Sequence, residues 1–284
     1  MAATEPPTPL AIALCHAPAV QPRIVVVTGS ASGMGAATRA RLEADGQRVV
    51  GVDLRDAEVV ADLGTPAGRQ AAIDAVADLA GGAIDGLVTW AGVAGLTEGP
   101  PGSLVASVNY FGTVALLEGL RPLLAAGDRP AAIAISSNST TVQPKVPRDV
   151  IERCLAGDEP GARETADAAG APGTYPATKT AIAWWVRRNA PGPDWAGAGI
   201  TLNAVAPGAV ETPLLQQSRD DPVLGRFVDT FPVPVGRTGT ADELAAFVAF
   251  LLGPDARFFC GSVVFVDGGT DAQLRPDDHP QPWG

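Results

Sequence analysis

Two acid–base side chains lie four positions apart in the segment GTYPATKTAIAWW, which runs from Gly173 to Trp185. Tyr175 carries a phenol and Lys179 an ammonium, and residues four apart share one face of a helix. A free tyrosine has a pKa of about 10, too high for a base near neutral pH. An ammonium about 4 Å away contributes on the order of 4 kcal/mol at an effective dielectric of 20, which lowers the pKa by roughly three units before desolvation acts in the opposite direction. The pair therefore fits a phenol that exchanges protons, although the same spacing is common on ordinary helices.

A glycine-rich turn, TGSASGMG, occupies positions 28–35 between a β-branched run and a helical pattern. Glycine permits a tight turn and close approach of a ligand. The helix that follows directs its free N–H groups at a phosphate. The sequence therefore predicts a dinucleotide-binding turn, with cofactor contacts at Gly29, Ser32, Gly33, Met34 and Gly35.

Asp53 ends the next buried run, where a carboxylate accepts hydrogen bonds from the adenosine ribose and repels the 2′-phosphate of NADP. Arg55 lies nearby and could instead accept that phosphate, but the glycine turn holds no basic residue, so NAD is the expected cofactor. Asp62 and Leu63 are expected beside the adenine. The plainer interpretation of Asp53 is a surface carboxylate at a strand end.

Strand-like and helix-like segments alternate along most of the chain. Apolar or β-branched runs typical of buried strands occur at 23–30, 48–54, 84–92, 131–137, 199–208 and 261–269. The alternation predicts an α/β fold: a single Rossmann-type, doubly wound parallel sheet of about seven strands with helices on both faces. We expect this domain at 23–275, a flexible Ala/Pro-rich extension at 1–22 and a tail at 276–284.

Charge and composition exclude several classes of partner. The net charge of −11 argues against nucleic acid, because phosphates would be repelled. Only two histidines occur, His16 and His279, so no metal site is expected. The three cysteines form no CxxC pair, which favours a reducing compartment. No apolar run reaches about 18 residues, and the N-terminal segment lacks the basic start of a signal peptide. We expect a cytoplasmic protein without a membrane partner.

Further motifs accompany the glycine turn and the phenol–ammonium pair. Asn109 lies in VNYFG, Ser137 ends ISS, Pro207 and Gly208 end APG, and Thr212 lies in ETP. Together these motifs resemble the short-chain dehydrogenase/reductase family. RDAEVVADL and VNYFG narrow the resemblance to its bacterial 3α-hydroxysteroid dehydrogenase/carbonyl reductase branch. The likeness spans about 24–275, which is nearly everything outside the tails.

The resemblance implies an NAD(H)-dependent oxidoreductase that interconverts a secondary alcohol and a ketone. Tyr175 would be the general acid and base, and Lys179 would hold the nicotinamide ribose. Ser137 would orient the substrate oxygen, and Asn109 would hold a water of a proton relay. Ser136 stays open as an alternative to Ser137, and Asn109 could instead only bridge the structure.

The resemblance also extends the cofactor site. The family's NAG motif appears here, altered, as TWAG at 89–92. Thr212 could instead be only a turn residue before Pro213. The further contacts implied are Ala91, Gly92, Pro207, Gly208, Val210 and Thr212, together with Tyr175 and Lys179.

Between Ser137 and Tyr175 the chain departs from the common family pattern through an insertion at about 142–173. It contains a short apolar helical stripe followed by a Gly/Pro break. The branch it resembles carries an insertion here that is associated with a homodimer instead of a tetramer. A surface excursion without a partner is the alternative. Pro176 suits a first helical turn, so we expect Tyr175 at the very start of its helix.

A segment at about 213–234 mixes apolar residues with loop formers, as a mobile lid over the substrate does. An ordinary packed excursion is the alternative. A largely apolar pocket favours cyclic, steroid-like, terpenoid or aromatic alcohols and ketones over sugars and small acids. The expected pocket residues are Val93, Ser137, Leu214, Leu215, Phe227 and Phe231.

Two other functions compete with the dehydrogenase. A redox-sensing regulator that binds NAD(H) without chemistry would need none of Ser137, Tyr175 and Lys179. A nucleotide-sugar epimerase or dehydratase would have a longer chain and a different glycine spacing. The intact motifs therefore favour the dehydrogenase.

Overall fold

The computed structural model describes residues 22–228 and 230–278, so nearly all of the expected N-terminal extension, with His16, lies outside the described residues. A seven-stranded sheet lies at the centre, in the order β3-β2-β1-β4-β5-β6-β7, and every pair of neighbours is parallel. The predicted Rossmann-type sheet is confirmed. The strands are β1 (Ile24–Thr28), β2 (Arg48–Asp53), β3 (Val59–Val60), β4 (Gly86–Thr89), β5 (Ala131–Ile135), β6 (Thr201–Pro207) and β7 (Val263–Val266).

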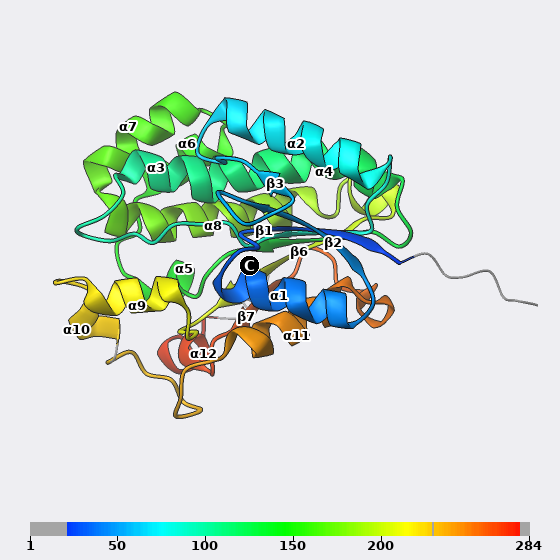
Figure 1. Ribbon diagram of the computed structural model, residues 1–284. Coiled ribbons are helices and arrows are strands. Elements are labelled where there is room, and N and C mark those ends of the chain that lie inside the picture. The colour runs from blue at the N-terminus through cyan, green and yellow to red at the C-terminus, as the bar shows by residue number, and fades with distance from the viewer. Residues whose placement is uncertain (1–21, 229, 279–284) are drawn as a thin grey trace, which may run out of the picture.

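Helices cover both faces of the sheet (Figure 1). One layer contains α2 (Pro66–Ala80), α3 (Gly102–Ala106), α4 (Thr113–Ala125), α6 (Arg148–Leu155), α7 (Glu159–Ala169) and α8 (Ala171–Asn189). The opposite layer contains α1 (Gly33–Ala44), α11 (Ala241–Leu252) and α12 (Thr270–Leu274). The shorter elements are α5 (Ser139–Val142), α9 (Pro213–Asp220), α10 (Gly225–Val228), η2 (Ala196–Ala198) and η3 (Pro254–Ala256).

The central strands are apolar throughout because both of their faces are covered. In β1, Val26 belongs to one core cluster while Val25 and Val27 belong to the other, and all three side chains are fully buried. This is the alternation of a strand between two helical layers. The sheet order reverses at β1, which pairs with β2 on one side and β4 on the other. A crevice is expected where the carboxyl ends of such strands diverge.

The long helix expected between the third and fourth strands is interrupted. Between α3 and α4 the backbone forms the π-helical segment η1 (Ser107–Gly112), which contains Asn109. Such segments are frequent at functional sites. The whole stretch Gly102–Ala125 is long and apolar enough to span a membrane, but it is mostly buried in the protein, as core helices of globular proteins are.

The expected insertion forms α6 and α7, which pack against α8 and α3. Its apolar stripe faces inward, since Val150, Ile151 and Cys154 are all buried within the chain. These three residues are therefore part of the subunit's own core.

The expectation that Tyr175 begins its helix is wrong, because α8 begins at Ala171, one turn earlier. Gly170, with φ of 73°, precedes the helix, and Pro172 occupies its first turn. These two residues start α8. Pro176 then lies inside the helix and only omits one N–H from the second turn.

Candidate active site

The glycine turn has the tight geometry that a phosphate needs. Gly29 has φ of 67°, which favours glycine. A Cβ on Gly35 would lie 2.0 Å from the carbonyl oxygen of Gly29, so the first turn of α1 packs directly on the preceding loop. The turn opens onto a cleft. Its predicted lining residues are Gly29, Ser32, Gly33, Met34, Gly35, Asp53, Asp62, Leu63, Ala91, Gly92 and Val93.

Asp53 stabilises the glycine turn from the end of β2. Its carboxylate accepts hydrogen bonds from the backbone N–H of Ala31, at 3.0 Å, and of Leu54, at 2.7 Å. The neighbouring arginines are paired with acids: Arg39 bonds Glu58 through both terminal nitrogens, and Arg55 lies beside Asp56 on the surface. Carboxylate charge therefore dominates this end of the cleft.

A second cleft brings the catalytic candidates together. Ser137, from the end of β5, lies in its wall with Tyr175 and Lys179 of α8. The two clefts adjoin, because Met34, Trp90, Gly92, Thr212 and Leu214 line both. Its other predicted lining residues are Pro207, Gly208, Val210 and Leu215.

Lys179 is 4% exposed. Its ammonium donates a hydrogen bond of 2.9 Å to the carbonyl oxygen of Ile135 and lies 5.8 Å from the centre of the Tyr175 ring. Burial lowers the pKa of Lys179 from 10.5 to about 8. The group is therefore still mostly charged at neutral pH.

Tyr175 behaves differently from the sequence-based expectation. Burial raises the pKa of its phenol above 10, while hydrogen bonding to the Ser137 side chain acts in the opposite direction. In the chain on its own, desolvation of the phenolate is the larger of these two effects, so the pKa is not lowered.

The structure distinguishes the two neighbouring serines. Ser136 donates its hydroxyl hydrogen to the carbonyl oxygen of Lys179 at 2.9 Å, so it ties β5 to α8. Ser137 accepts a hydrogen bond from the backbone N–H of Ser139 at 3.1 Å and partners the phenol of Tyr175. Ser137 is therefore the serine whose hydroxyl shares a site with the tyrosine.

Asn109 and Thr212 both have structural partners. The Asn109 amide accepts from the N–H of Val93 at 2.8 Å and donates to its carbonyl at 3.0 Å, so it clamps the loop after β4. Thr212 is the N-cap of α9, accepting from the N–H of Leu215 at 3.2 Å. Asn109 therefore has the bridging role, and Thr212 the turn role, that the sequence left open as alternatives. Thr212 also lines both clefts.

Two expected pocket residues lie elsewhere. Phe227 and Phe231 line neither cleft, and Phe227 is 49% exposed with the Arg226 guanidinium 4.7 Å from the centre of its ring. The short helix α10 turns this side chain outward. Asp229, in the same expected lid segment, lies outside the described residues.

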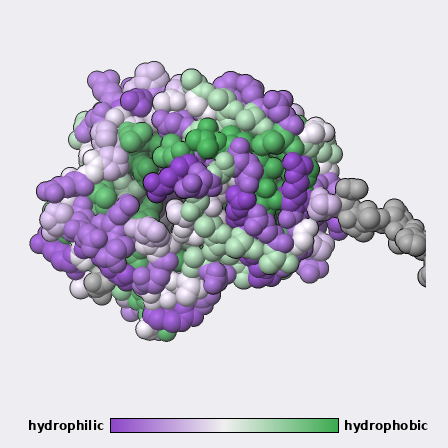
Figure 2. Space-filling view, in the orientation of Figure 1, coloured by the Kyte–Doolittle hydropathy of each residue, from purple (hydrophilic) through white to green (hydrophobic). Residues whose placement is uncertain are grey.

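The structure adds residues that the motifs did not single out. Trp90 stands where the family motif has asparagine, lines both clefts and has a buried indole N–H without a partner among the described residues. Leu104 and Val108, one helical turn apart, line the first cleft. Their four-residue spacing, which puts both side chains on one face of a helix, is the sequence pattern that could have identified them. Figure 2 shows apolar residues gathered on this side of the molecule, in the region of α2, α3 and β3.

Comparison with known proteins shows which proteins this chain is similar to. It is 42% identical over 256 residues to a 3-alpha-hydroxysteroid dehydrogenase/carbonyl reductase from Comamonas testosteroni, covering 89% of this chain and 98% of that protein. The crystal structure of a 3-alpha-hydroxysteroid dehydrogenase from Pseudomonas sp. B-0831, complexed with NADH, superposes with a TM-score of 0.86 at 46% identity, covering 89% of this chain and 99% of that one.

The chain belongs to the short-chain dehydrogenase/reductase family. A family model described as enoyl-(acyl carrier protein) reductase matches residues 163–271. Levodione reductase from Leifsonia aquatica is 30% identical, covering 88% of this chain and 94% of that protein. The protein is accordingly an oxidoreductase of the short-chain dehydrogenase/reductase family, and the resemblance inferred from its motifs is confirmed.

Proposed function

We propose that this short-chain dehydrogenase/reductase interconverts a secondary alcohol and a ketone with NAD(H). One observation carries the proposal: Ser137, Tyr175 and Lys179 line a single cleft that adjoins the cleft of the glycine turn. A redox sensor would require only the cleft of the glycine turn. The arrangement instead provides an acid–base group beside a place for a dinucleotide.

The residues present fit a dinucleotide. The glycine turn is tight, because the first turn of α1 packs on the Gly29 carbonyl with no space for a Cβ on Gly35, and the turn lines the first cleft. The buried ammonium of Lys179 makes one hydrogen bond among the described residues, to Ile135, so further N–H donors remain for ribose hydroxyls. Asp53 favours NAD over NADP, because its carboxylate would repel a 2′-phosphate and the nearby Arg39 is engaged by Glu58. The NADH bound to the Pseudomonas relative supports the same choice.

A bound nicotinamide would supply or accept the hydride. Tyr175 would take the proton of the substrate hydroxyl in oxidation and return it to the carbonyl oxygen in reduction. Ser137 would hydrogen-bond that oxygen and orient it. The ammonium of Lys179 would favour the phenolate, opposing the effect of burial on the pKa of Tyr175. The clamp from Asn109 to Val93 would keep the loop after β4 in place beside the site.

The proposed substrate is an apolar cyclic, steroid-like, terpenoid or aromatic alcohol or ketone. In the second cleft, apolar side chains surround Ser137, Tyr175 and Lys179. These apolar residues are Met34, Trp90, Ile135, Val210, Leu214 and Leu215. Apolar pockets with a few convergent polar groups select ligands of this kind. The relatives named for hydroxysteroids, levodione and coniferyl alcohol support the same class.

The test is a panel of hydroxysteroids, cyclic terpenoid alcohols and aryl alcohols, with sugars and small hydroxy acids as the contrasting set. Oxidation is followed by the absorbance of reduced nicotinamide, with NAD and NADP in parallel. We expect turnover of the apolar set with NAD. Exclusive turnover of the polar set, or a preference for NADP, would contradict the proposed substrate class or cofactor respectively.

We further propose a cytoplasmic homodimer. Cys154 and Cys260 are free thiols, as expected in a reducing compartment. In the described part of the chain β7 pairs only with β6, and its four residues are partly exposed. Phe258 is fully exposed and Phe250 is 41% exposed on the adjoining α11. Because the α6 stripe faces inward, this edge is the better candidate interface.

Sedimentation equilibrium tests the assembly. Wild-type chain should have the mass of two subunits, and Phe258→Asp should shift it toward one. Leu79→Asp, an exposed apolar position on α2, serves as the matched control and should not dissociate the dimer. A mass of four subunits, or dissociation by the control alone, would contradict the proposed assembly.

A further inference from the structure

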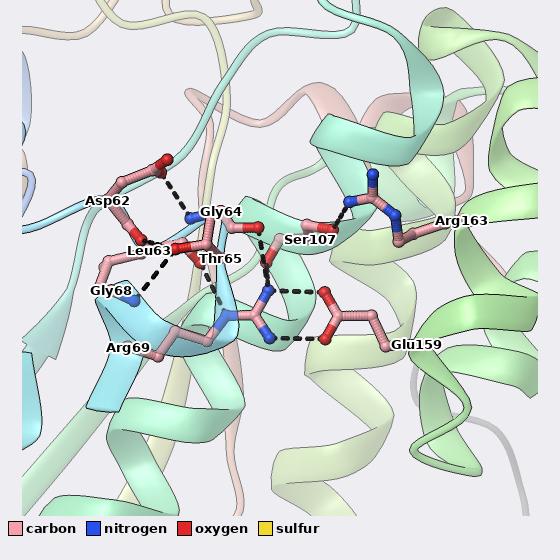
Figure 3. A network of polar contacts seen from close by, with 9 residues as sticks. All are labelled: Asp62, Leu63, Gly64, Thr65, Gly68, Arg69, Ser107, Glu159 and Arg163. Atoms are coloured by element: carbon pink, nitrogen blue, oxygen red, sulfur yellow. Dashed lines mark hydrogen bonds and ion pairs between the residues drawn. The ribbon is translucent and has the colours of Figure 1, made fainter. Parts of the chain in front are cut away.

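A buried arginine connects the insertion to the cofactor cleft. Arg69, in the first turns of α2, is 6% exposed and uses its guanidinium in three directions (Figure 3). Its Nε donates to the carbonyl oxygen of Leu63 at 2.8 Å. Its Nη2 donates to the carbonyl of Ser107 at 3.0 Å, with Gly64 at 3.5 Å. Nη1 and Nη2 both donate to the Glu159 carboxylate, each at 2.7 Å.

Glu159 supplies the charge that lets Arg69 stay buried. It lies in the first turn of α7, within the insertion, and meets the guanidinium as a two-pronged pair. Burial pushes the pKa of Glu159 upward, but the bonds and charge of Arg69, with smaller contributions from Ser107 and Arg163, hold it below its usual value. Buried ion pairs contribute little net stability, so their main effect is to fix one geometry.

The carbonyl groups held by Arg69 belong to one wall of the first cleft. Leu63 lines this cleft together with Asp62, whose carboxylate accepts a hydrogen bond of 2.8 Å from the N–H of Gly64. The segment 62–64 is therefore fixed from both sides: by Asp62 locally and by Arg69 from α2. Glu159 is the only carboxylate bonded to Arg69 among the described residues.

The adjoining residues of α3 and η1 are tied to Arg69 and to α7 as well, and they pack directly beside Gly64. Leu104 and Val108 line the cleft, and Ser107 lies between them on η1. The carbonyl of Ser107 accepts from Arg69, and its hydroxyl accepts from the Arg163 guanidinium of α7 at 2.6 Å. Arg69 and Ser107 are thus both linked to α7 of the insertion, through Glu159 and Arg163 respectively, as Figure 3 shows.

We propose that Glu159 and Arg69 are positioning residues for the adenosine end of the cofactor cleft, so that the insertion sets cofactor affinity. The inference rests on the proposed function of that cleft. Without the Glu159 charge, Arg69 is left buried and unpaired and must move toward water. The carbonyls of Leu63 and Gly64 then lose their donor, and the wall beside the adenine loosens. The reacting groups on β5 and α8 do not touch this network.

The test compares Glu159→Gln with wild type in steady-state kinetics and in fluorescence titrations with NADH and with ADP-ribose, the probe of the adenosine end. We expect the KM for NAD and both dissociation constants to rise about tenfold, or ~1.4 kcal/mol. The kcat at saturating NAD should stay within about twofold, since the interaction lost is one of cofactor binding and not of the transition state. Glu159→Asp, which keeps the charge, should restore part of the affinity.

Arg153→Gln is the matched control, because it removes an ion pair to Asp158 in the same insertion that lies away from the cleft. It should leave cofactor affinity unchanged. If Glu159→Gln does not fold, Arg163→Gln decides, because it releases the Ser107 hydroxyl while leaving the Arg69–Glu159 pair in place, and it should raise the KM for NAD in the same direction.

Three outcomes would overturn the inference: unchanged affinity in a folded Glu159→Gln, an equal loss in the Arg153→Gln control, or a fall in kcat with no change in KM. Wild-type chain that binds no NADH would instead overturn the proposed function itself. The two failures are therefore distinguishable.

Discussion

Replacing Lys179 with Met should change how the stability of the chain depends on pH. Burial lowers the pKa of Lys179 from 10.5 to about 8. Between these two values the unfolded chain holds a proton that the folded chain has released. Stability rises with pH wherever the unfolded state binds more protons. The penalty of burying Lys179 is therefore complete below about pH 8 and fades as pH approaches 10.5.

The difference between these pKa values corresponds to roughly 3 kcal/mol, at about 1.4 kcal/mol for each pH unit. Met is apolar, of similar length and does not titrate. The variant also loses the hydrogen bond from Lys179 to Ile135, but that loss shifts its stability by a constant amount. Only the change with pH in the difference between the two unfolding free energies reports the cost of burying the Lys179 charge.

The assay is urea unfolding followed by tryptophan fluorescence, without cofactor, from about pH 7 to about pH 10. Relative to Lys179→Met, the wild type should gain about 2–3 kcal/mol over this range. Cys154, whose pKa burial raises to about 12, titrates in both chains, so its effect cancels. The same comparison in a Tyr175→Phe background removes the phenol's titration. Parallel stability curves would refute the inference that burial disfavours the Lys179 ammonium.

Two further substitutions probe the cofactor cleft. Gly35→Ala should destabilise the chain by at least about 1–3 kcal/mol in urea unfolding and weaken NADH binding, because its Cβ would meet the Gly29 carbonyl; a fully stable variant with normal NADH affinity would contradict the described turn. Asp53→Asn should lower the ratio of kcat/KM for NAD over NADP about tenfold by removing the charge that repels a 2′-phosphate, and an unchanged ratio would show that Asp53 does not set the preference.

Sequence alone predicted most of the sheet, because a strand buried on both faces leaves an unbroken apolar run such as IVVVT in β1. It did not locate β3, since the two residues Val59 and Val60 are too few to show a period. It also missed η1, because a π-helical segment differs from an α-helix in its hydrogen bonds and not in its apolar pattern.

Motifs picked out residues that line the two clefts where the backbone dictates the residue, as at Gly35, and where a polar side chain follows a strand, as Ser137 does. They failed where tertiary packing decides. The outward direction of Phe227 depends on which neighbours cover its helix. The rise in the pKa of Tyr175 in the chain on its own depends on the cost of burial, whose size is visible only in the folded chain.

The most direct test of the account is single-turnover oxidation by Tyr175→Phe with a substrate that the wild type accepts. The phenyl ring keeps the packing of the phenol but cannot exchange a proton. The account predicts that the variant still binds NADH and that its rate falls by roughly 10²–10⁴-fold. A rate close to that of the wild type would contradict the assignment of Tyr175 as the acid–base group.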